Sequence, residues 1–320
     1  MSVCVGVDIG GTKIAASAVS GDGRILQRAR RETPAQDPDL IEHAVADLVR
    51  ELDGAVRTMG ERVQGVGVAC AGFIDRAGEN VMFAPNLAWR DEPLKANLEN
   101  LIDLPVALEN DANAAAWGEF RFGAAQDVED LLMITLGTGI GGGIVIDGEL
   151  LRGAHGMGAE VGHLRVVPDG HRCGCGNKGC WEAYASGTAL VREARAMMVA
   201  GSPHAATLVE MCGGEPTKLV GAMITEAAQQ GDVAGIELLD DVGRWTGEAL
   251  ASLAAVLDPA LIVIGGGVSQ AGDLVLEPAR SAFARQLTGR GHRDVTPLVQ
   301  AQLGNDAGMV GAADLAARRA

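Results

Sequence analysis

The chain repeats one short pattern near its start and again near its middle. The first copy runs from Val3 and consists of a β-branched segment, a glycine turn at Gly10, a second apolar segment, an Asp-Gly turn and a third segment. The second copy covers residues 131–151 and places a glycine-rich turn at Gly137 in the same position. Each copy predicts a three-stranded antiparallel meander. Their recurrence indicates a weak internal duplication.

Helical and strand-like segments alternate after each predicted meander, which indicates an α/β architecture in two lobes. After the first meander, the sequence predicts helix 38–58, strand 63–69, helix 92–101, strand 105–108 and helix 112–122. After the second, it predicts helix 186–200, helical stretches through 217–256, strand 261–264, helix 273–287 and a closing helix at 307–319. A length of 320 residues is also typical of two domains.

Charge and hydropathy exclude several classes of partner. The 42 acidic residues exceed the 26 Lys and Arg residues, so the formal net charge is −16. Long polyanions and anionic membranes need a broad basic surface, so nucleic acid and membrane are not expected as partners. We find neither a membrane span nor a signal peptide, and we expect a cytoplasmic protein. Glycine is abundant, with 45 of 320 residues, and it suits tight turns and close approach to a ligand.

Three glycine turns are candidates for holding nucleotide phosphates. In the first, backbone N–H groups of Gly10, Gly11, Thr12 and Lys13 would converge on a phosphate while Asp8 orients Mg²⁺; a plain β-turn is the alternative. The second turn, Gly137-Thr138-Gly139, is followed by Gly142 at the spacing of the G-x-G-x-x-G dinucleotide fingerprint. A strand follows it rather than the helix which that fingerprint requires. A pair of glycine turns that hold the phosphates together, one from each predicted lobe, fits this sequence better than a dinucleotide site. The third turn, with Gly265 and Gly266, follows a strand and suits an adenine or ribose site, although a generic strand-to-helix turn fits too.

Asn110 and Asp111 stand between a predicted strand and a predicted helix. Either side chain suits the N-cap of that helix. Asp111 is also placed to accept the proton of an attacking hydroxyl group, as a general base. Both interpretations hold together if Asn110 caps the helix and Asp111 points away from it.

Three cysteines within eight positions give the sharpest signal. Cys173, Cys175 and Cys180 follow His163 at a spacing that predicts a closed, structural Cys₃His zinc site. His171 is a competing ligand, and spacing alone does not exclude it. The acids Glu160 and Glu182 flank this site and suit recognition of a polyhydroxylated substrate, with surface solvation as the alternative.

Together these segments resemble the ROK family (repressor, open reading frame, kinase), and within it an actinobacterial branch of bacterial glucokinases. The matching segments are VGVDIGGTK (5–13), FAPNLAWR (83–90), ENDANAAAWGEFRFG (109–123), ITLGTGIGGG (134–143), GAEVGH (158–163), CGCGNKGCWE (173–182) and IVIGGGVS (262–269). Two departures from the usual family pattern are Glu109 and the segment Cys70–Phe73, which includes Gly72 near the sugar.

The resemblance implies an actin-like ATPase (ribonuclease H-like) fold with a central cleft, and ATP-dependent transfer of the γ-phosphoryl group to O6 of D-glucose. It implies a small lobe of residues 1–110 with a C-terminal helix at about 300–320, and a large lobe of residues 111–299. It makes Asp111 the general base, and it implies Mg²⁺ on the nucleotide, structural Zn²⁺ and a homodimer or homotetramer. The residues that it assigns to the sugar are Gly72, Asn86, Asn110, Asp111, Glu160, His163 and Glu182.

Three alternative functions are weighed at this stage. A kinase for another hexose, such as mannose, N-acetylmannosamine or fructose, would share the same motifs. A sugar-responsive transcriptional regulator of the same family would carry an N-terminal DNA-binding module, and Asp8 lies too near the start to leave room for one. A non-catalytic sugar-binding module would not need Asp111 or the phosphate turns.

Overall fold

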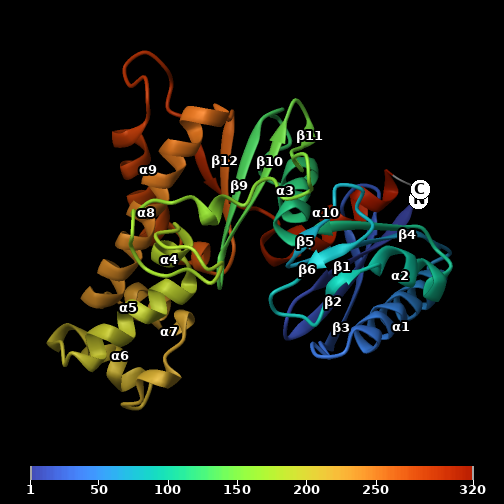
Figure 1. The fold of residues 1–320 in the computed structure, drawn as a ribbon, viewed down its shortest axis with the longest axis horizontal. Coiled ribbons are helices and arrows are strands. Elements are labelled where there is room, and N and C mark those ends of the chain that lie inside the picture. The colour runs from blue at the N-terminus through green and yellow to red at the C-terminus, as the bar shows by residue number, and fades with distance from the viewer. Residues whose placement is uncertain (1, 319–320) are drawn as a thin grey trace. The chain divides into compact units, whose positions relative to one another are not determined.

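The computed structural model describes residues 2–318, and strands and helices alternate along them as the sequence predicts. The chain forms two compact units (Figure 1). Unit 1 contains Met1–Leu132, Gly143–Ala159 and Ala301–Ala320, and unit 2 contains Met133–Gly142 and Glu160–Gln300. Among the described residues, no helix combines the length and apolar character that a membrane span requires.

The first sheet is built around the predicted N-terminal meander. Strands β1 (Val3–Ile9), β2 (Lys13–Ser20) and β3 (Ile25–Glu32) pair antiparallel in sequence order. Strands β4 (Val63–Cys70) and β8 (Val106–Asn110) extend the sheet on the other side of β1 in parallel, giving the order β3-β2-β1-β4-β8. The carboxyl ends of β1, β4 and β8 therefore meet at one edge of the sheet.

Helices cover both faces of this sheet. Helix α1 (Pro38–Arg57), capped by Asp37, packs on the face where alternate residues of β1 such as Val5 and Val7 join Leu48 in the main core. Helix α10 (Ala307–Ala317) packs on the opposite face. It approaches so closely that a Cβ atom at Gly6 would lie 1.8 Å from the Met309 carbonyl oxygen, which explains glycine inside a strand.

The second sheet repeats the strand order of the first. Strands β9 (Leu131–Leu136), β10 (Ile140–Ile146), β11 (Glu149–Leu150), β12 (Leu261–Gly265) and β13 (Leu298–Gln300) lie in the order β11-β10-β9-β12-β13. In both sheets the three strands of the meander are followed by two further strands next to its first strand. This shared order supports the internal duplication. Strand β10 begins at Ile140, only three residues after Gly137, and it includes Gly141, Gly142 and Gly143.

Helices make up most of unit 2 (Figure 1). They are α4 (Glu182–Ala185), α5 (Gly187–Val199), α6 (Ala206–Met211), α7 (Gly221–Gln229), α8 (Val233–Leu257) and α9 (Asp273–Gln286). The helical stretch expected at 217–256 is two helices, because α7 ends at a Gly231 turn and Asp232 caps α8. Gly247 lets α8 pack closely on α9, since a Cβ atom there would lie 2.2 Å from the Ala279 carbonyl oxygen.

Three short strands in unit 1 are absent from the sequence-based expectation. Strands β5 (Phe73–Ile74), β6 (Val81–Phe83) and β7 (Arg90–Glu92) form a small antiparallel sheet, followed by helix α2 (Leu94–Ile102). They are too short to show a period in the sequence. The predicted closing helix ends at Ala317, and residue 319 lies outside the described residues.

The compact units differ from the expected lobes at residues 111–132 and 143–159, which lie in unit 1 and include helix α3 (Asp111–Phe122). The expected boundary at residue 110 assigns α3 to the large lobe, with residues 111–299. In the structure α3 belongs to unit 1, because it packs along α10. A Cβ atom at Gly311 of α10 would lie 1.8 Å from the Ala114 carbonyl oxygen, so the two helices are in direct backbone contact.

Candidate active site

The first phosphate turn connects β1 with β2 and is held by backbone hydrogen bonds. The Gly10 N–H donates to the Lys13 carbonyl oxygen at 3.0 Å, and Thr33 Oγ1 donates to the Gly10 carbonyl oxygen at 2.7 Å. A Cβ atom at Gly11 would lie 3.1 Å from Cβ of Asn86. The structure thus brings Asn86, expected at the sugar, against the turn expected at the phosphates.

Asn110 is the N-cap of α3, as one of the two sequence interpretations holds. Its Oδ1 accepts from the backbone N–H groups of Ala112 at 2.9 Å and Asn113 at 3.1 Å. Asp111 follows as the first helical residue, and its Oδ1 accepts from the Ala112 N–H at 2.9 Å. Burial raises the pKa of the Asp111 carboxyl group. A raised pKa makes this carboxylate a better proton acceptor than an exposed one.

Gly72 supports Asn110 from the end of β4. The Asn110 Nδ2 group donates to the Gly72 carbonyl oxygen at 3.2 Å. A Cβ atom at Gly72 would lie 2.8 Å from the Phe83 carbonyl oxygen, so the close approach requires glycine. The side-chain oxygen of Asn110 serves the helix cap, so at most one N–H of its amide is left for a sugar hydroxyl group.

Carboxylates gather at the edge of the first sheet. Burial, together with the negative charge of Asp111, raises the pKa of Asp8 to about 6, and Lys13 opposes this shift. Cys70 ends β4 among the same groups, and its pKa is raised by burial and by the charges of Asp111, Asp8 and Glu109. Such crowding of like charges is typical of sites that bind a cation or transfer a proton.

Glu109 and Arg152 form a buried ion pair just before the start of α3. Arg152 Nε donates to Glu109 Oε2 at 2.7 Å, and the Glu109 side chain is only 6% exposed. Glu109 Oε1 accepts from Asn113 Nδ2 and from the Asn110 backbone N–H, both at 3.1 Å. Glu109 therefore holds Asn110, just before Asp111, and Asn113, two residues after it. The sequence marks Glu109 only as a departure from the usual pattern, and it gives no sign of Arg152.

In unit 2, the second phosphate turn is held by the first residues of α5. The Gly137 N–H donates to the Gly139 carbonyl oxygen at 3.0 Å. The Gly187 N–H donates to the Gly137 carbonyl oxygen at 2.7 Å, and Thr188 Oγ1 donates to the Thr138 carbonyl oxygen, also at 2.7 Å. The carbonyl groups of the turn are thus bound from one side by the start of α5.

The predicted zinc ligands come together in unit 2. One ligand atom from each of His163, Cys173, Cys175 and Cys180 lies within 4.8 Å of the others. Cys173 Sγ is 3.6 Å from His163 Nδ1, and Cys175 Sγ is 3.7 Å from Cys180 Sγ. His171, the competing ligand, packs instead on Tyr184, with its backbone N–H donating to the Tyr184 hydroxyl group at 2.8 Å.

These spacings fit a tetrahedral zinc ion. Zinc–sulfur bonds of about 2.3 Å and zinc–nitrogen bonds of about 2.0 Å place the ligand atoms of a tetrahedron roughly 3.5–3.8 Å apart. Burial raises the pKa of the Cys173 thiol to about 12. Although burial opposes it, the Asn177 N–H and the neighbouring thiols lower the pKa of Cys175. The donor set and its geometry both suit a structural metal.

The two acids expected at the sugar both lie beside the zinc ligands. Glu160 Oε2 lies 3.9 Å from His163 Nε2, so the imidazole directs Nδ1 to the cysteines and Nε2 to this carboxylate. Glu182 Oε1 lies 3.5 Å from Cys173 Sγ, and its Oε2 accepts from the Ile140 backbone N–H at 3.0 Å. Glu182 thus reaches from the cysteine cluster to the second phosphate turn.

A cavity of about 980 Å³ opens next to that turn, within unit 2. Gly137 and Thr138 line it on one side, and Gly267 and Val268 line it on another. Gly265 and Gly266, the pair that the sequence singles out, immediately precede these residues. Gly266 has a φ of +86°, and a Cβ atom there would lie 2.5 Å from the Leu136 carbonyl oxygen, so this turn requires glycine. The remaining walls come from α5 and α7.

Residues from those two helices are the part of the cavity that sequence reasoning missed. They include Thr188 and Arg195 from α5 and Thr225 and Gln229 from α7. Arg195 donates from NH2 to the carbonyl oxygens of Thr217 and Leu219, both at 2.9 Å, and so holds the segment before α7 in place. Helix surfaces of this kind carry no motif, so only the Ser186-Gly187-Thr188 start of α5 offered a signal.

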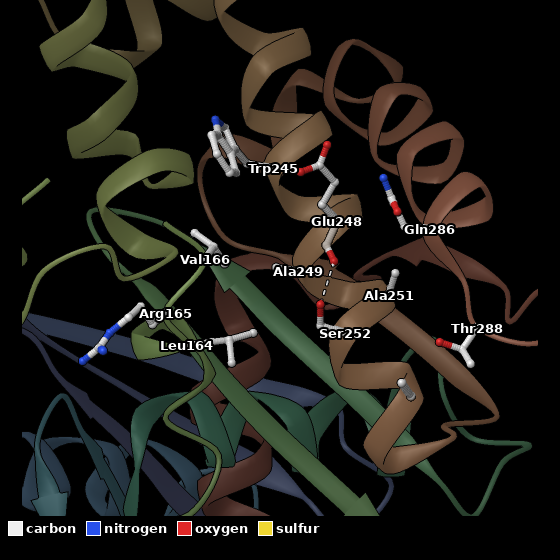
Figure 2. Close-up of a pocket in the computed structure, with 11 residues that line it drawn as sticks. Leu164, Arg165, Val166, Trp245, Glu248, Ala249, Ala251, Ser252, Gln286 and Thr288 are labelled. Atoms are coloured by element: carbon white, nitrogen blue, oxygen red, sulfur yellow. Dashed lines mark hydrogen bonds between the residues drawn. The ribbon is translucent and has the colours of Figure 1, made fainter. Parts of the chain in front are cut away.

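A second cavity, of about 630 Å³, lies between α8 and the segment 164–166 (Figure 2). Trp245, Glu248 and Ser252 of α8 face it, with Gln286 at its far side. Its lining includes none of the residues expected at zinc, sugar or nucleotide, so it is separate from the candidate site of unit 2.

Comparison with known proteins agrees with these observations. The family model described as "ROK family" matches residues 4–319. The chain belongs to the ROK family. A glucokinase from Streptomyces coelicolor is 48% identical over 316 residues, which cover 99% of this chain and 98% of that protein. The family also accounts for the actin-like α/β fold expected from the sequence.

The fold is also similar to that of a solved ROK structure. It is a ROK family glucokinase from Streptomyces griseus in complex with glucose and AMPPNP, with a TM-score of 0.89 and 48% identity, covering 99% of this chain and 100% of that one. The family also includes regulators. A xylose repressor from Bacillus subtilis is 28% identical over 94% of this chain and 70% of the repressor.

Proposed function

We propose that this ROK protein is an ATP-dependent glucokinase, which transfers the γ-phosphoryl group of ATP to O6 of D-glucose. The observation that carries the proposal is the half-buried Asp111 carboxylate at the start of α3, next to the Asn110 cap and the Asn110 backbone N–H that Glu109 binds. The identity to the Streptomyces coelicolor glucokinase, at 48%, is well above that to the xylose repressor, at 28%. ATP as donor would place the enzyme in the cytoplasm.

Asp111 is the proposed general base for the sugar 6-hydroxyl group. Its raised pKa improves its match to a hydroxyl proton, and its position on α3 keeps it from rotating away. Phosphoryl transfer depends mainly on positioning and on charge stabilisation, so a rigidly held base is the main contribution that unit 1 makes to the chemistry. Asn86 and Asn110 would orient the sugar beside it.

The base of the nucleotide is proposed to lie in the 980 Å³ cavity of unit 2, with its phosphates near the N–H groups of the Gly137–Gly139 turn. The Gly10–Lys13 turn of unit 1 is proposed separately as a phosphate-binding turn. Bound Mg²⁺ would supply neutralisation of phosphate charge, and Asp8 is the carboxylate placed to orient it. Its neighbour Lys13 lies on the same turn and adds a positive charge. Backbone dipoles thus provide most of the phosphate contacts.

Zinc is proposed to be held by His163, Cys173, Cys175 and Cys180, with a structural role. A closed Cys₃His set leaves no position for a reacting water molecule. The ion would fix His163 Nε2 and the two flanking acids, Glu160 and Glu182, for the sugar hydroxyl groups. Self-association as a dimer or tetramer stays a prediction from the family resemblance.

The function is tested by measuring kcat/KM with ATP for glucose, mannose, N-acetylmannosamine and fructose. We expect glucose to exceed each of the others by at least about tenfold, which corresponds to about 1.4 kcal/mol of transition-state discrimination. A preference for another hexose would favour the alternative ROK kinase. Sugar binding without turnover would favour a regulator.

The role of Asp111 is tested by Asp111→Asn, which keeps the size of the side chain and removes the base. We expect kcat to fall by about 10²–10⁴-fold, the usual contribution of a general base. The glucose dissociation constant should change little, since Asn can still accept from the Ala112 N–H. The melting temperature should not fall, because the substitution removes a charge that burial disfavours. Turnover near the wild-type rate would refute this assignment.

A further inference from the structure

We propose that Glu182 is a positioning residue that ties the Cys₃His cluster to the Gly137–Ile140 turn, so that metal occupancy sets the affinity for nucleotide phosphates as well as for sugar. The inference rests on the zinc and nucleotide sites proposed above. It adds to them a physical connection within unit 2, through one carboxylate and the short helix that carries it.

The two oxygens of Glu182 face different parts of the unit. Oε2 accepts from the Ile140 N–H at 3.0 Å, directly after the turn, and Oε1 lies 3.5 Å from Cys173 Sγ. The fit at the turn is close, since a Cβ atom at Gly139 would lie 2.3 Å from Oε2. A side chain at position 139 would therefore displace the Glu182 carboxylate from this position.

The backbone around Glu182 makes the same connection. Cys180, the last predicted zinc ligand, lies two residues before Glu182, and the Trp181 N–H between them donates to the Leu164 carbonyl oxygen at 2.8 Å. Trp181 is fully buried, which fixes the start of α4. Two residues after α4 ends, the Gly187 N–H binds the Gly137 carbonyl oxygen at 2.7 Å. A rigid segment thus runs from the cysteines to the turn.

This role is compatible with sugar binding. An ionised carboxylate offers about four lone-pair positions, and the Ile140 N–H uses one of them. Sugar hydroxyl groups can occupy others. When the cysteines are not held together, the Cys180–Glu182 segment is no longer fixed. The Ile140 N–H at the end of the turn then loses Glu182 as its hydrogen-bond acceptor. We therefore expect loss of metal to loosen the turn that the phosphates contact.

The test uses the full-length protein, with and without zinc, and a non-hydrolysable ATP analogue with Mg²⁺ in the absence of sugar. Glu182→Gln keeps the side-chain length, so its amide oxygen can still accept from the Ile140 N–H. Glu182→Asp keeps the charge but is shorter by one methylene group and does not reach. Glu193→Gln, on the exposed face of α5, is the matched control.

We expect the dissociation constant of the analogue to rise by about tenfold in Glu182→Asp and to stay within about twofold of wild type in Glu182→Gln and Glu193→Gln. Removing zinc from the wild type should raise it by a similar factor, and should have little further effect in Glu182→Asp, since the two changes break one connection. Glucose affinity should fall in both Glu182 variants. If Glu182 bound only sugar, Glu182→Asp and Glu182→Gln would therefore not differ in their affinity for the analogue.

The connection should also act in reverse, because coupling between sites is reciprocal. Gly139→Ala places a methyl group against the Glu182 carboxylate, so we expect the affinity for zinc, measured by chelator competition at equilibrium, to fall several-fold relative to the wild type. This readout does not depend on activity.

Two results would overturn the inference in distinguishable ways. A wild type that contains zinc and phosphorylates glucose, but whose analogue affinity is unchanged by Glu182→Asp and by zinc removal, would overturn the connection alone. A wild type without zinc would overturn both the connection and the zinc assignment.

Discussion

The Asp8 carboxyl group lies where its ionised form lowers the stability of the folded protein. Burial and the charge of Asp111 disfavour ionisation, and the pKa of this group is raised from 3.8 to about 6. The folded protein therefore binds a proton at Asp8 more tightly than the unfolded chain. The stabilisation that this proton provides is fully present below a pH of about 4 and is lost as the pH rises through about 6.

Asp8→Asn removes the charge and should therefore stabilise the protein at neutral pH. A shift of two pKa units corresponds to about 3 kcal/mol, and we expect a gain of about 2 kcal/mol in the free energy of unfolding at pH 8 and little gain at pH 4. Activity should fall, because the carboxylate is proposed to orient Mg²⁺. Urea unfolding at pH 4, 6 and 8 without nucleotide or divalent ions measures the effect.

The surface variant Asp240→Asn, on α8, is the control for the Asp8 experiment and should show no comparable gain at any of these pH values. An Asp8→Asn protein that is no more stable than wild type at pH 8 would mean that the carboxylate is not held in an unfavourable state.

At the scale of elements, the start of α3 depends on the buried ion pair of Glu109 and Arg152. Arg152→Ala leaves the Glu109 carboxylate buried, with 6% of its side chain exposed, and without its cationic partner. We expect a loss of about 2–4 kcal/mol in the free energy of unfolding, and a lower kcat because Asn110 and Asn113 are no longer fixed. Chemical denaturation and steady-state kinetics measure the two effects.

Adding Glu109→Gln to Arg152→Ala should restore more than half of the lost stability. The Gln amide is neutral, and its oxygen can still accept from Asn113 and from the Asn110 N–H. Arg50→Ala breaks the exposed pair with Asp47 and should cost less than about 1 kcal/mol. Equal losses from Arg152→Ala and Arg50→Ala would contradict the special role of the buried pair.

Helices and strands that a local sequence pattern marks could be predicted from the sequence. Contacts between residues far apart in the sequence could not. The β1–β3 meander matches the prediction because β-branched segments and glycine turns mark it locally, and α1 matches the predicted helix 38–58. The His163–Cys180 cluster was found because its ligands lie in one loop. The choice of His163 over His171 needed the structure, since Tyr184, thirteen residues from His171, decides it. Likewise, the Glu109–Arg152 pair joins residues 43 positions apart, which no spacing rule connects.

At the scale of the whole molecule, the net charge of −16 is compatible with binding a triphosphate. Long polyanions require a broad basic surface, whereas one nucleotide needs only converging N–H groups and a metal ion. The glycines serve two purposes here. Gly137 and Gly266 shape the turns beside the cavity, whereas Gly6 and Gly311 allow backbones to touch in the core of unit 1.

The division into two units leads to a prediction about where zinc matters. The zinc ligands all lie in unit 2, whereas the core around β1 and α1 lies in unit 1. Zinc removal or Cys175→Ala should therefore speed amide exchange in residues 160–190 and in the Gly137–Ile140 turn by about tenfold or more, which reflects a loss of about 1.4 kcal/mol in local stability. Exchange in β1, β4 and α1 should change little.

Hydrogen–deuterium exchange with mass spectrometry measures both units in one experiment, and metal analysis gives the zinc content. Cys212→Ala, which removes a buried thiol outside the cluster, should keep one zinc ion per chain and the exchange pattern of the wild type. This pattern would show that zinc stabilises only the loop that carries Glu160 and Glu182, because its binding free energy would go into ordering that loop. Equal acceleration in both units would show instead that zinc stabilises the fold globally.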